Sequence, residues 1–195
     1  MISILSSLSL EFILETIAVL TALIYVVLAA KGNYWCFLFG LISSTIYLYI
    51  CFLYQLYFDV GINLFYIFMS IYGWFNWKSH SELGQLSISR TNGKTIFYLI
   101  ILGLSLNLFL AEFASRYSNA SLPYLDAFTS IFSIIGTYLV IQRKIENWLF
   151  WIVIDIVATG MYFYKELYLT SALFLIYTVI AIIGYFNWKK QLYLD

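Results

Sequence analysis

Long apolar segments alternate with short polar ones along the chain. Seven segments approach the roughly 20 apolar residues that a helix needs to cross the hydrocarbon core of a bilayer. They are Phe12–Ala30, Tyr34–Tyr54, Val60–Trp77, Thr95–Ala111, Leu125–Ile141, Asn147–Tyr164 and Leu167–Trp188. Residues 1–10 contain no Lys or Arg, so the basic start of a cleaved signal peptide is missing and the first helix should remain. The pattern predicts an all-α integral membrane protein with seven transmembrane helices.

Composition agrees with this prediction and excludes other classes of protein. Of the 195 residues, 63% are hydrophobic and 10% are charged, whereas an ordinary soluble domain is roughly 25% charged. A soluble globular protein needs a polar exterior that this chain cannot supply, and a disordered chain would be far less hydrophobic. The 10 Lys+Arg and 10 Asp+Glu residues balance, so no basic excess is present to bind nucleic acid. The single Pro disfavours a β-barrel.

An internal repeat orders the seven segments. The stretch Ile71-Tyr-Gly-Trp-Phe-Asn-Trp-Lys78 resembles Ile182-Ile-Gly-Tyr-Phe-Asn-Trp-Lys189 at an offset of 111 residues. Upstream, an offset of 113 matches further pairs, which predicts two extra residues near Tyr54: Tyr25 with Tyr138, Lys31 with Lys144, Trp35 with Trp148, and Tyr49 with Tyr162. We expect three-helix repeats at 11–80 and 121–191, joined by a linker at 81–120 that contains the fourth helix. One intervening helix makes the repeats parallel (a 3+1+3 arrangement), as in transporters that bind substrate near mid-bilayer.

The basic residues predict the orientation of the chain. Only Arg116 and Lys165 fall on the side of the N-terminus. The other eight fall on the opposite side: Lys31, Lys78, Arg90, Lys94, Arg143, Lys144, Lys189 and Lys190. By the positive-inside rule the C-terminus is cytoplasmic and the N-terminus outside. We expect Trp77 and Trp188 to form a belt at the cytoplasmic interface, and Trp148 to be an interface anchor.

Asp155, in the middle of the sixth segment, is the most informative polar residue. A carboxylate inside a membrane is costly and usually functional, and no Lys or Arg lies inside any span. Either the carboxyl group is protonated or hydrogen-bonded by Tyr and Asn, or it balances the charge of a cationic substrate. Trp151 lies four residues earlier on the same helix face, where an indole suits a flat aromatic cation. Plain helix packing is the alternative to substrate contact for four further candidates: Asn63, Tyr66, Trp74 and Tyr177.

Signatures of catalysis are missing from the sequence. His80, the only His, lies in a predicted loop, so the spans have no His-based metal site or triad. Neither a Gly-x-Ser-x-Gly nor a P-loop pattern occurs. We therefore expect no catalytic residue, no metal and no cofactor. A receptor without transport is one alternative class. An intramembrane enzyme that pairs Asp155 with a second carboxylate such as Asp126 is another. Ion coupling and oligomeric state, including a homo-oligomer, stay open.

These features together resemble the PnuC-type vitamin transporters, whose fold is related to that of the SWEET sugar transporters. The resemblance covers nearly the whole chain, and its motifs are Ile71-Tyr-Gly-Trp-Phe-Asn-Trp77, Glu146-Asn-Trp148, Trp151-x-x-x-Asp155 and Leu167-Tyr-Leu-Thr170. It implies a multi-pass protein of the bacterial inner membrane that lets a vitamin diffuse down its gradient. A separate cytoplasmic kinase would then trap the vitamin by phosphorylation.

The resemblance also bears on the substrate. Nicotinamide riboside is the archetypal substrate of the family, and its transporters typically carry Trp-x-x-x-Asn where this chain has Trp151-x-x-x-Asp155. An Asn side chain both donates and accepts hydrogen bonds, whereas an ionised Asp only accepts but adds a negative charge. Nicotinamide riboside and thiamine are both cations, and the aminopyrimidine of thiamine is a donor. Nicotinamide riboside is therefore expected first, only slightly ahead of thiamine.

Overall fold

The computed structural model of the chain describes residues 2–82, 87–117 and 121–193. Within them the chain forms no strand and seven α-helices: α1 (Ile2–Ala30), α2 (Cys36–Leu53), α3 (Tyr57–Glu82), α4 (Gly93–Tyr117), α5 (Pro123–Ile141), α6 (Asn147–Tyr164) and α7 (Tyr168–Leu192). Six of these helices are long and apolar enough to cross a membrane. The exception is α3, whose sequence mixes Asn, Tyr and Trp among its apolar residues. The predicted all-α membrane fold is confirmed.

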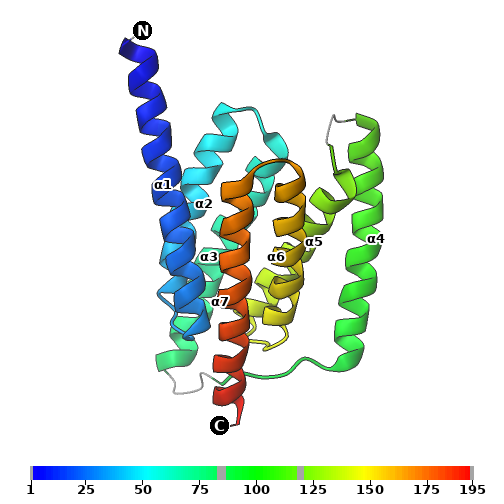
Figure 1. Cartoon of the computed structure of the whole chain (residues 1–195). Helices are drawn as coiled ribbons and strands as arrows, with labels where there is room; N and C mark the ends of the chain where they lie inside the picture. The colour runs from blue at the N-terminus through cyan, green and yellow to red at the C-terminus, as the bar shows by residue number, and fades with distance from the viewer. Residues whose placement is uncertain (1, 83–86, 118–120, 194–195) are drawn as a thin grey trace. The chain divides into compact units, whose positions relative to one another are not determined.

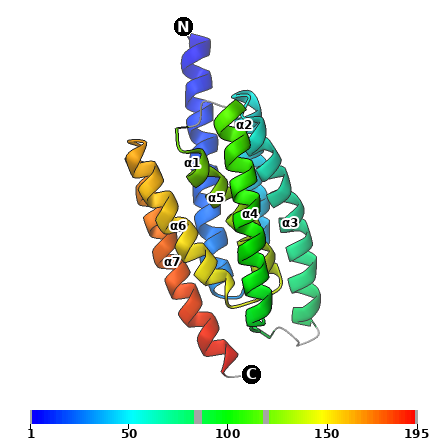
Figure 2. The same cartoon turned by 90° about the vertical axis from the view of Figure 1, so that its right-hand side faces the viewer.

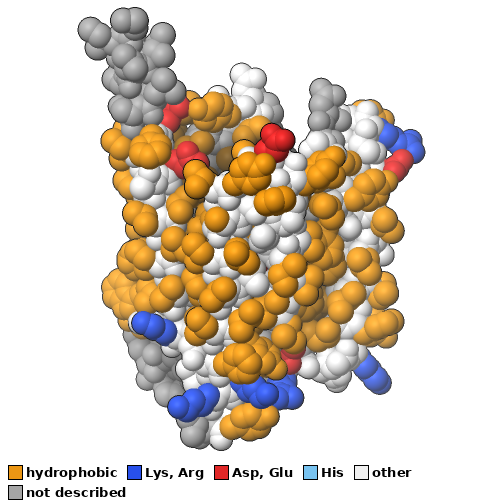
Figure 3. Space-filling view, in the orientation of Figure 1, with side chains coloured by type: hydrophobic (Ala, Val, Ile, Leu, Met, Phe, Trp, Pro, Cys, Tyr) orange, Lys and Arg blue, Asp and Glu red, His pale blue; other side chains and the backbone are white. Residues whose placement is uncertain are grey.

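The helices pack as two compact units, Met1–Leu86 and Ser87–Asp195. In the first unit, α2 packs against both α1 and α3. In the second unit, α4 packs against α5, α5 against α6, and α6 against α7. Within each unit, consecutive helices are antiparallel, as Figure 1 shows for α1–α3 and Figure 2 for α6 and α7. Apolar side chains cover much of the outer surface along the helices (Figure 3), as expected of lipid-facing surfaces.

Four of the helices end in the same hydrogen-bonded motif. At the end of α1, Asn33 N donates to Leu28 O (3.0 Å) and Gly32 N donates to Ala29 O (2.9 Å). This is the Schellman pattern, in which the residue after the C-cap takes a positive φ. That residue is Gly32 after α1 (φ 69°), and its counterparts after α2, α5 and α6 are Gln55, Arg143 and Glu166 (φ 58°, 52° and 61°). Only Gly32 avoids the Cβ clash that disfavours this conformation.

The hydrogen bonds also fix the register of the repeat. The bond from Leu56 N to Cys51 O (2.9 Å) recurs as Leu167 N to Tyr162 O (2.9 Å), 111 residues later. Helix α2 recurs as α6 at the same offset, and Gly32 recurs as Arg143. The offset of 113 upstream of Tyr54, with two extra residues in that loop, is therefore wrong. The mistaken offset arises from the composition, because a chain that is 21% aromatic can match its own Tyr and Trp residues in a false register.

The tryptophans expected at the membrane interface lie in the protein interior. Trp77 and Trp188 are completely buried, and Trp148 is almost completely buried. Trp188 meets Trp148 edge to face, with ring centroids 5.5 Å apart and an interplanar angle of 90°. In the first unit Trp77 meets Phe37 in the same way, at 5.0 Å and 87°. The belt and anchor interpretations are therefore wrong, and these rings join the second helix of each repeat to the third.

The segment before α4 is tied to the α5–α6 loop. Ser89 N donates to Arg143 O (3.1 Å), and Ile145 N donates to Ser89 O (3.0 Å). Lys144 Nζ donates to Ser89 Oγ (2.8 Å), which adds a side-chain hydrogen bond to this connection. The Arg143 side chain is buried, and burial lowers its pKa to about 10. The guanidinium therefore still carries its positive charge at neutral pH.

Candidate functional site

Asp155 lies on α6 with its side chain inside the protein, where only 3% of the residue is exposed. Its backbone oxygen accepts a hydrogen bond from Thr159 Oγ1 (2.7 Å), one turn later on the helix. Among the described residues, no side chain donates a hydrogen bond to the Asp155 carboxyl group and no cation pairs with it. The alternative in which Tyr or Asn side chains hydrogen-bond this group therefore finds no support among the described residues, and protonation and a bound cation are the alternatives that remain.

Trp151 lies one turn before Asp155 and is half-buried between α6 and α5. It packs against a buried apolar cluster of the second unit formed by Phe132, Ile135, Leu139 and Ile154. The indole also lies against Gly136 of α5, where an added Cβ would lie 3.2 Å from both Nε1 and Cε2 of Trp151. The indole is thus fixed from the α5 side, one turn from the buried carboxyl group.

Tyr177, the candidate on α7, belongs to a row of aromatic rings between α6 and α7. Phe174 stacks on Tyr162 with centroids 5.2 Å apart and an interplanar angle of 12°. Tyr177 then meets Phe174 edge to face at 5.8 Å. Lys165 Nζ lies 5.8 Å from the centroid of the Tyr162 ring and so adds a cation at the end of the row. Tyr177 is half-buried and remains a candidate for substrate contact.

The three candidates of the first unit lie on α3. Asn63 Nδ2 donates to Asp59 O (2.9 Å) and lies 4.0 Å from Cys51 Sγ. Trp74 meets Tyr34 and Trp35 edge to face, at 5.2 and 4.9 Å. Tyr66 is half-buried, with its ring 5.7 Å from that of Phe65. In the first unit these groups are half-buried aromatic and amide side chains, and the assignment of all three residues to a binding site stays a prediction.

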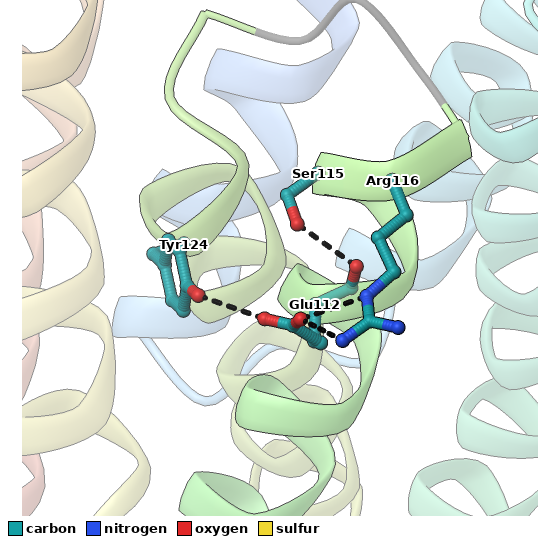
Figure 4. A network of polar contacts seen from close by, with 4 residues as sticks. All are labelled: Glu112, Ser115, Arg116 and Tyr124. Carbon is teal, nitrogen blue, oxygen red and sulfur yellow. Dashed lines mark hydrogen bonds and ion pairs between the residues drawn. The ribbon is translucent and has the colours of Figure 1, made fainter.

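Two polar networks that the sequence did not predict lie where α5 begins. Lys165, the C-cap of α6, pairs with Asp126 in the first turn of α5. The N-cap of α5 is Leu122, which makes no side-chain hydrogen bond to the helix. Beside it, Glu112 on α4 accepts hydrogen bonds from Arg116 Nε (2.8 Å) and Tyr124 OH (3.1 Å), as Figure 4 shows. These contacts join α4, α5 and α6 at one end of the second unit.

Metal chemistry finds no support in the described part of the chain. No three His, Cys, Asp or Glu side chains there are grouped so as to hold a metal ion. Cys36 and Cys51 are both buried and not joined in a disulfide. What the described residues offer is a buried carboxyl group beside an indole, and this combination suits the binding of an organic cation.

Comparison with known proteins identifies the family. Residues 12–190 match the sequence model of the family described as "Nicotinamide mononucleotide transporter". The chain belongs to this transporter family. It is therefore a multi-pass membrane transporter and not an enzyme.

Relatives within the nicotinamide mononucleotide transporter family cover most of the chain. The nicotinamide riboside transporter PnuC of Neisseria mucosa is 29% identical over 190 residues, which span 91% of this chain and 72% of that protein. The protein of the same name from Haemophilus influenzae is 27% identical over 184 residues, or 91% of this chain and 79% of that protein. The crystal structure of the vitamin B3 transporter PnuC has the same fold, with a TM-score of 0.74 over 98% of this chain and 87% of that one, at 24% identity.

Proposed function

We propose that this transporter takes up nicotinamide riboside by facilitated diffusion and alternating access. The observation that carries the proposal is the buried Asp155 carboxyl group, unpaired among the described residues and one turn from the half-buried indole of Trp151. Nicotinamide riboside carries its positive charge on a flat pyridinium ring. A carboxylate supplies the countercharge and an indole supplies a face for the ring. The PnuC relatives named for this substrate support the same assignment.

The same geometry favours the nucleoside over the nucleotide that appears in the family's description. Nicotinamide mononucleotide adds a phosphate group, which needs basic or N–H donors at its binding site. On α6 the buried polar groups are Asn147 and Asp155, and the helix itself contains no Lys or Arg. A buried carboxylate beside a phosphate would add repulsion without compensation. Uptake of nicotinamide riboside, whose ribose carries no phosphate, avoids this cost. A separate cytoplasmic kinase then phosphorylates it.

Thiamine is the second candidate substrate, because Asp155 stands where nicotinamide riboside transporters of this type are expected to carry Asn. The thiazolium ring of thiamine is a cation, so it gains the same countercharge. Its aminopyrimidine donates hydrogen bonds, and an ionised carboxylate accepts them without offering a donor in return. Thiamine therefore differs from nicotinamide riboside in hydrogen bonding and not in charge.

Charge placement in the second unit supports an inner-membrane location with a cytoplasmic C-terminus. Lys189 and Lys190 lie in the last turn of α7, and Arg143 and Lys144 lie in the α5–α6 loop. Arg90 Nη2 lies 3.5 Å from Tyr193 OH, which brings the segment before α4 to the same end. Figure 3 shows most of the visible blue Lys and Arg side chains in its lower part and one at the upper right. An excess of basic residues is typical of the cytoplasmic side.

Uptake by purified protein tests the proposal. The protein is placed in liposomes that contain a nicotinamide riboside kinase and ATP, and labelled nicotinamide riboside, nicotinamide mononucleotide and thiamine are compared. We expect uptake of nicotinamide riboside by wild type, strong loss in Asp155→Ala, and little change in Glu166→Gln, an exposed acid on the α6–α7 loop. Equal uptake by Asp155→Ala and wild type would exclude the countercharge role. Faster uptake of thiamine, with thiamine kinase inside, would reverse the order of the two substrates.

A further inference from the structure

At two equivalent positions of the two units, the order of a large and a small residue is reversed. In the second unit, Trp151 of α6 packs against Gly136 of α5. At the offset of 111 residues, the equivalent pair in the first unit is Gly40 of α2 and Tyr25 of α1. There the aromatic ring comes from the other helix, since an added Cβ at Gly40 would lie 3.0 Å from Tyr25 Cδ2. Each helix pair thus holds one aromatic ring against one glycine, but only the second unit presents its ring from the helix that carries Asp155.

The contact at Gly136 is specific to one part of the indole. A Cβ at this position would lie 3.2 Å from Nε1, 3.2 Å from Cε2 and 3.5 Å from Cζ2 of Trp151. Carbon contacts are most favourable at about 3.5–4.0 Å, so an added methyl group would push the nitrogen-bearing edge of the ring away from α5. Trp151 also packs against the cluster that contains Phe132, Leu139 and Ile154, and this packing restricts how the ring can adjust.

We propose that Gly136 is a positioning residue for substrate binding, which sets the orientation in which Trp151 presents its indole beside Asp155. The inference rests on the proposed function, because it assigns a substrate-binding role to that indole. A ring held against bare backbone has little rotational freedom left, so less conformational entropy is lost when a substrate ring binds it. The side chain of residue 136 therefore tunes the affinity for an aromatic cation without touching the substrate itself.

A pair of matched glycine substitutions tests this role. Gly136→Ala and Gly160→Ala both replace a helical glycine and gain the same helix propensity. Gly160, on α6, has open space around its Cβ position, so it controls for effects other than contact with Trp151. We expect Gly136→Ala to raise the KM for nicotinamide riboside uptake about tenfold with the maximum rate within about twofold. Gly160→Ala should leave both values at those of wild type.

A second measurement separates positioning from general damage. The near-UV circular dichroism of Trp151 is obtained by subtracting the spectrum of Trp151→Phe, and Gly136→Ala should change this difference whereas Gly160→Ala should not. In the Trp151→Phe background, Gly136→Ala should no longer raise KM, because the smaller ring has no nitrogen-bearing edge at this position. An unchanged KM in Gly136→Ala, or the same rise in both backgrounds, would overturn the proposal.

The outcome also distinguishes this inference from the proposed function. If wild type takes up no nicotinamide riboside, the proposed function fails while the circular dichroism difference still reports whether Gly136 orients Trp151. An unchanged difference spectrum in Gly136→Ala then overturns the positioning role as well. A changed spectrum together with a raised KM for thiamine would support the positioning role with thiamine as the substrate.

Discussion

Lys165 and Asp126 form an ion pair, with Nζ 2.8 Å from Oδ1 and 3.1 Å from Oδ2, that joins the end of α6 to the start of α5. The equivalent of Lys165 in the first unit is Tyr54, whose hydroxyl donates to Glu11 Oε2 on α1 (2.7 Å). In both three-helix repeats the C-cap of the second helix therefore reaches an acidic residue of the first helix. The repeat keeps this connection while the donor changes from a tyrosine hydroxyl to a lysine ammonium group, which makes the second contact an ion pair.

Loss of the ion pair should destabilise the second unit modestly. The two side chains are 22% and 37% exposed, so we expect Lys165→Met to lower the free energy of unfolding by about 1 kcal/mol. Thermal unfolding in detergent should shift down by roughly 2–4 °C. The control is Arg116→Met, which removes the ion pair with Glu112. Both side chains of that pair are more exposed than Lys165 and Asp126, so this substitution should lower the free energy of unfolding by less. A larger shift in the control would contradict the importance of burial for this pair.

Glycine should stabilise the loops that end α2 and α6. Gln55 and Glu166 are exposed residues held at positive φ, where a side chain costs roughly 1–2 kcal/mol. Glycine removes this cost but adds flexibility to the unfolded chain, so we expect Gln55→Gly and Glu166→Gly each to gain about 0.5 kcal/mol. Gly32→Ala, at the equivalent position after α1, should instead lose stability. Melting temperatures that fall in both glycine variants would contradict the Schellman geometry.

Crowding at Gly40 should be measurable in the first unit. An added Cβ would lie 3.0 Å from Tyr25 Cδ2 and 3.1 Å from Ser70 Oγ, so we expect Gly40→Ala to cost about 1–3 kcal/mol through overpacking. Gly61→Ala on α3 is the matched control, because nothing lies near its Cβ position. Thermal unfolding of the two variants gives the comparison. Equal melting temperatures would show that α1 and α2 are less tightly packed at this point.

Truncation of Trp188 should be far more costly than truncation of its exposed neighbour. Trp188 is completely buried against Trp148, whereas Phe186 is 62% exposed. We expect Trp188→Ala to lose about 3–5 kcal/mol of stability because it leaves a cavity, and Phe186→Ala to lose much less. Should the Trp188→Ala variant not be recovered, Trp188→Phe gives a smaller loss of the same origin. Comparable losses for Trp188→Ala and Phe186→Ala would restore the interface-belt interpretation.

The sequence predicted the helices well because membrane spans leave a strong signal. Each of the seven apolar segments corresponds to one helix, since twenty consecutive apolar residues have few other solutions in a bilayer. Burial was harder to predict for Trp77 and Trp188. A Trp followed by Lys at a helix end is typical of an interface belt, and only the packing of Phe37 and Trp148 against them places these rings inside.

The candidate site shows where residue patterns stop being informative. Asp155 stood out because it is an isolated acid within an apolar helix, and its burial agrees with that interpretation. Gly136 gave no such signal, because a glycine in a membrane helix is common. Its contact with Trp151 becomes visible only in the packed structure, and the correct register then pairs Tyr25 with Gly136 and Gly40 with Trp151. The false offset of 113 paired Tyr25 with Tyr138 and hid this exchange.

The countercharge role of Asp155 is tested most directly by changing the charge of the ligand and of the residue together. Nicotinamide riboside is a cation, and its reduced dihydro form has nearly the same shape without the charge. Dissociation constants of both ligands are measured with wild type and with Asp155→Asn, which keeps the size of the side chain. The account predicts that wild type binds the cation at least tenfold more tightly than the neutral form and that Asp155→Asn abolishes this preference. The same preference in both proteins would contradict it.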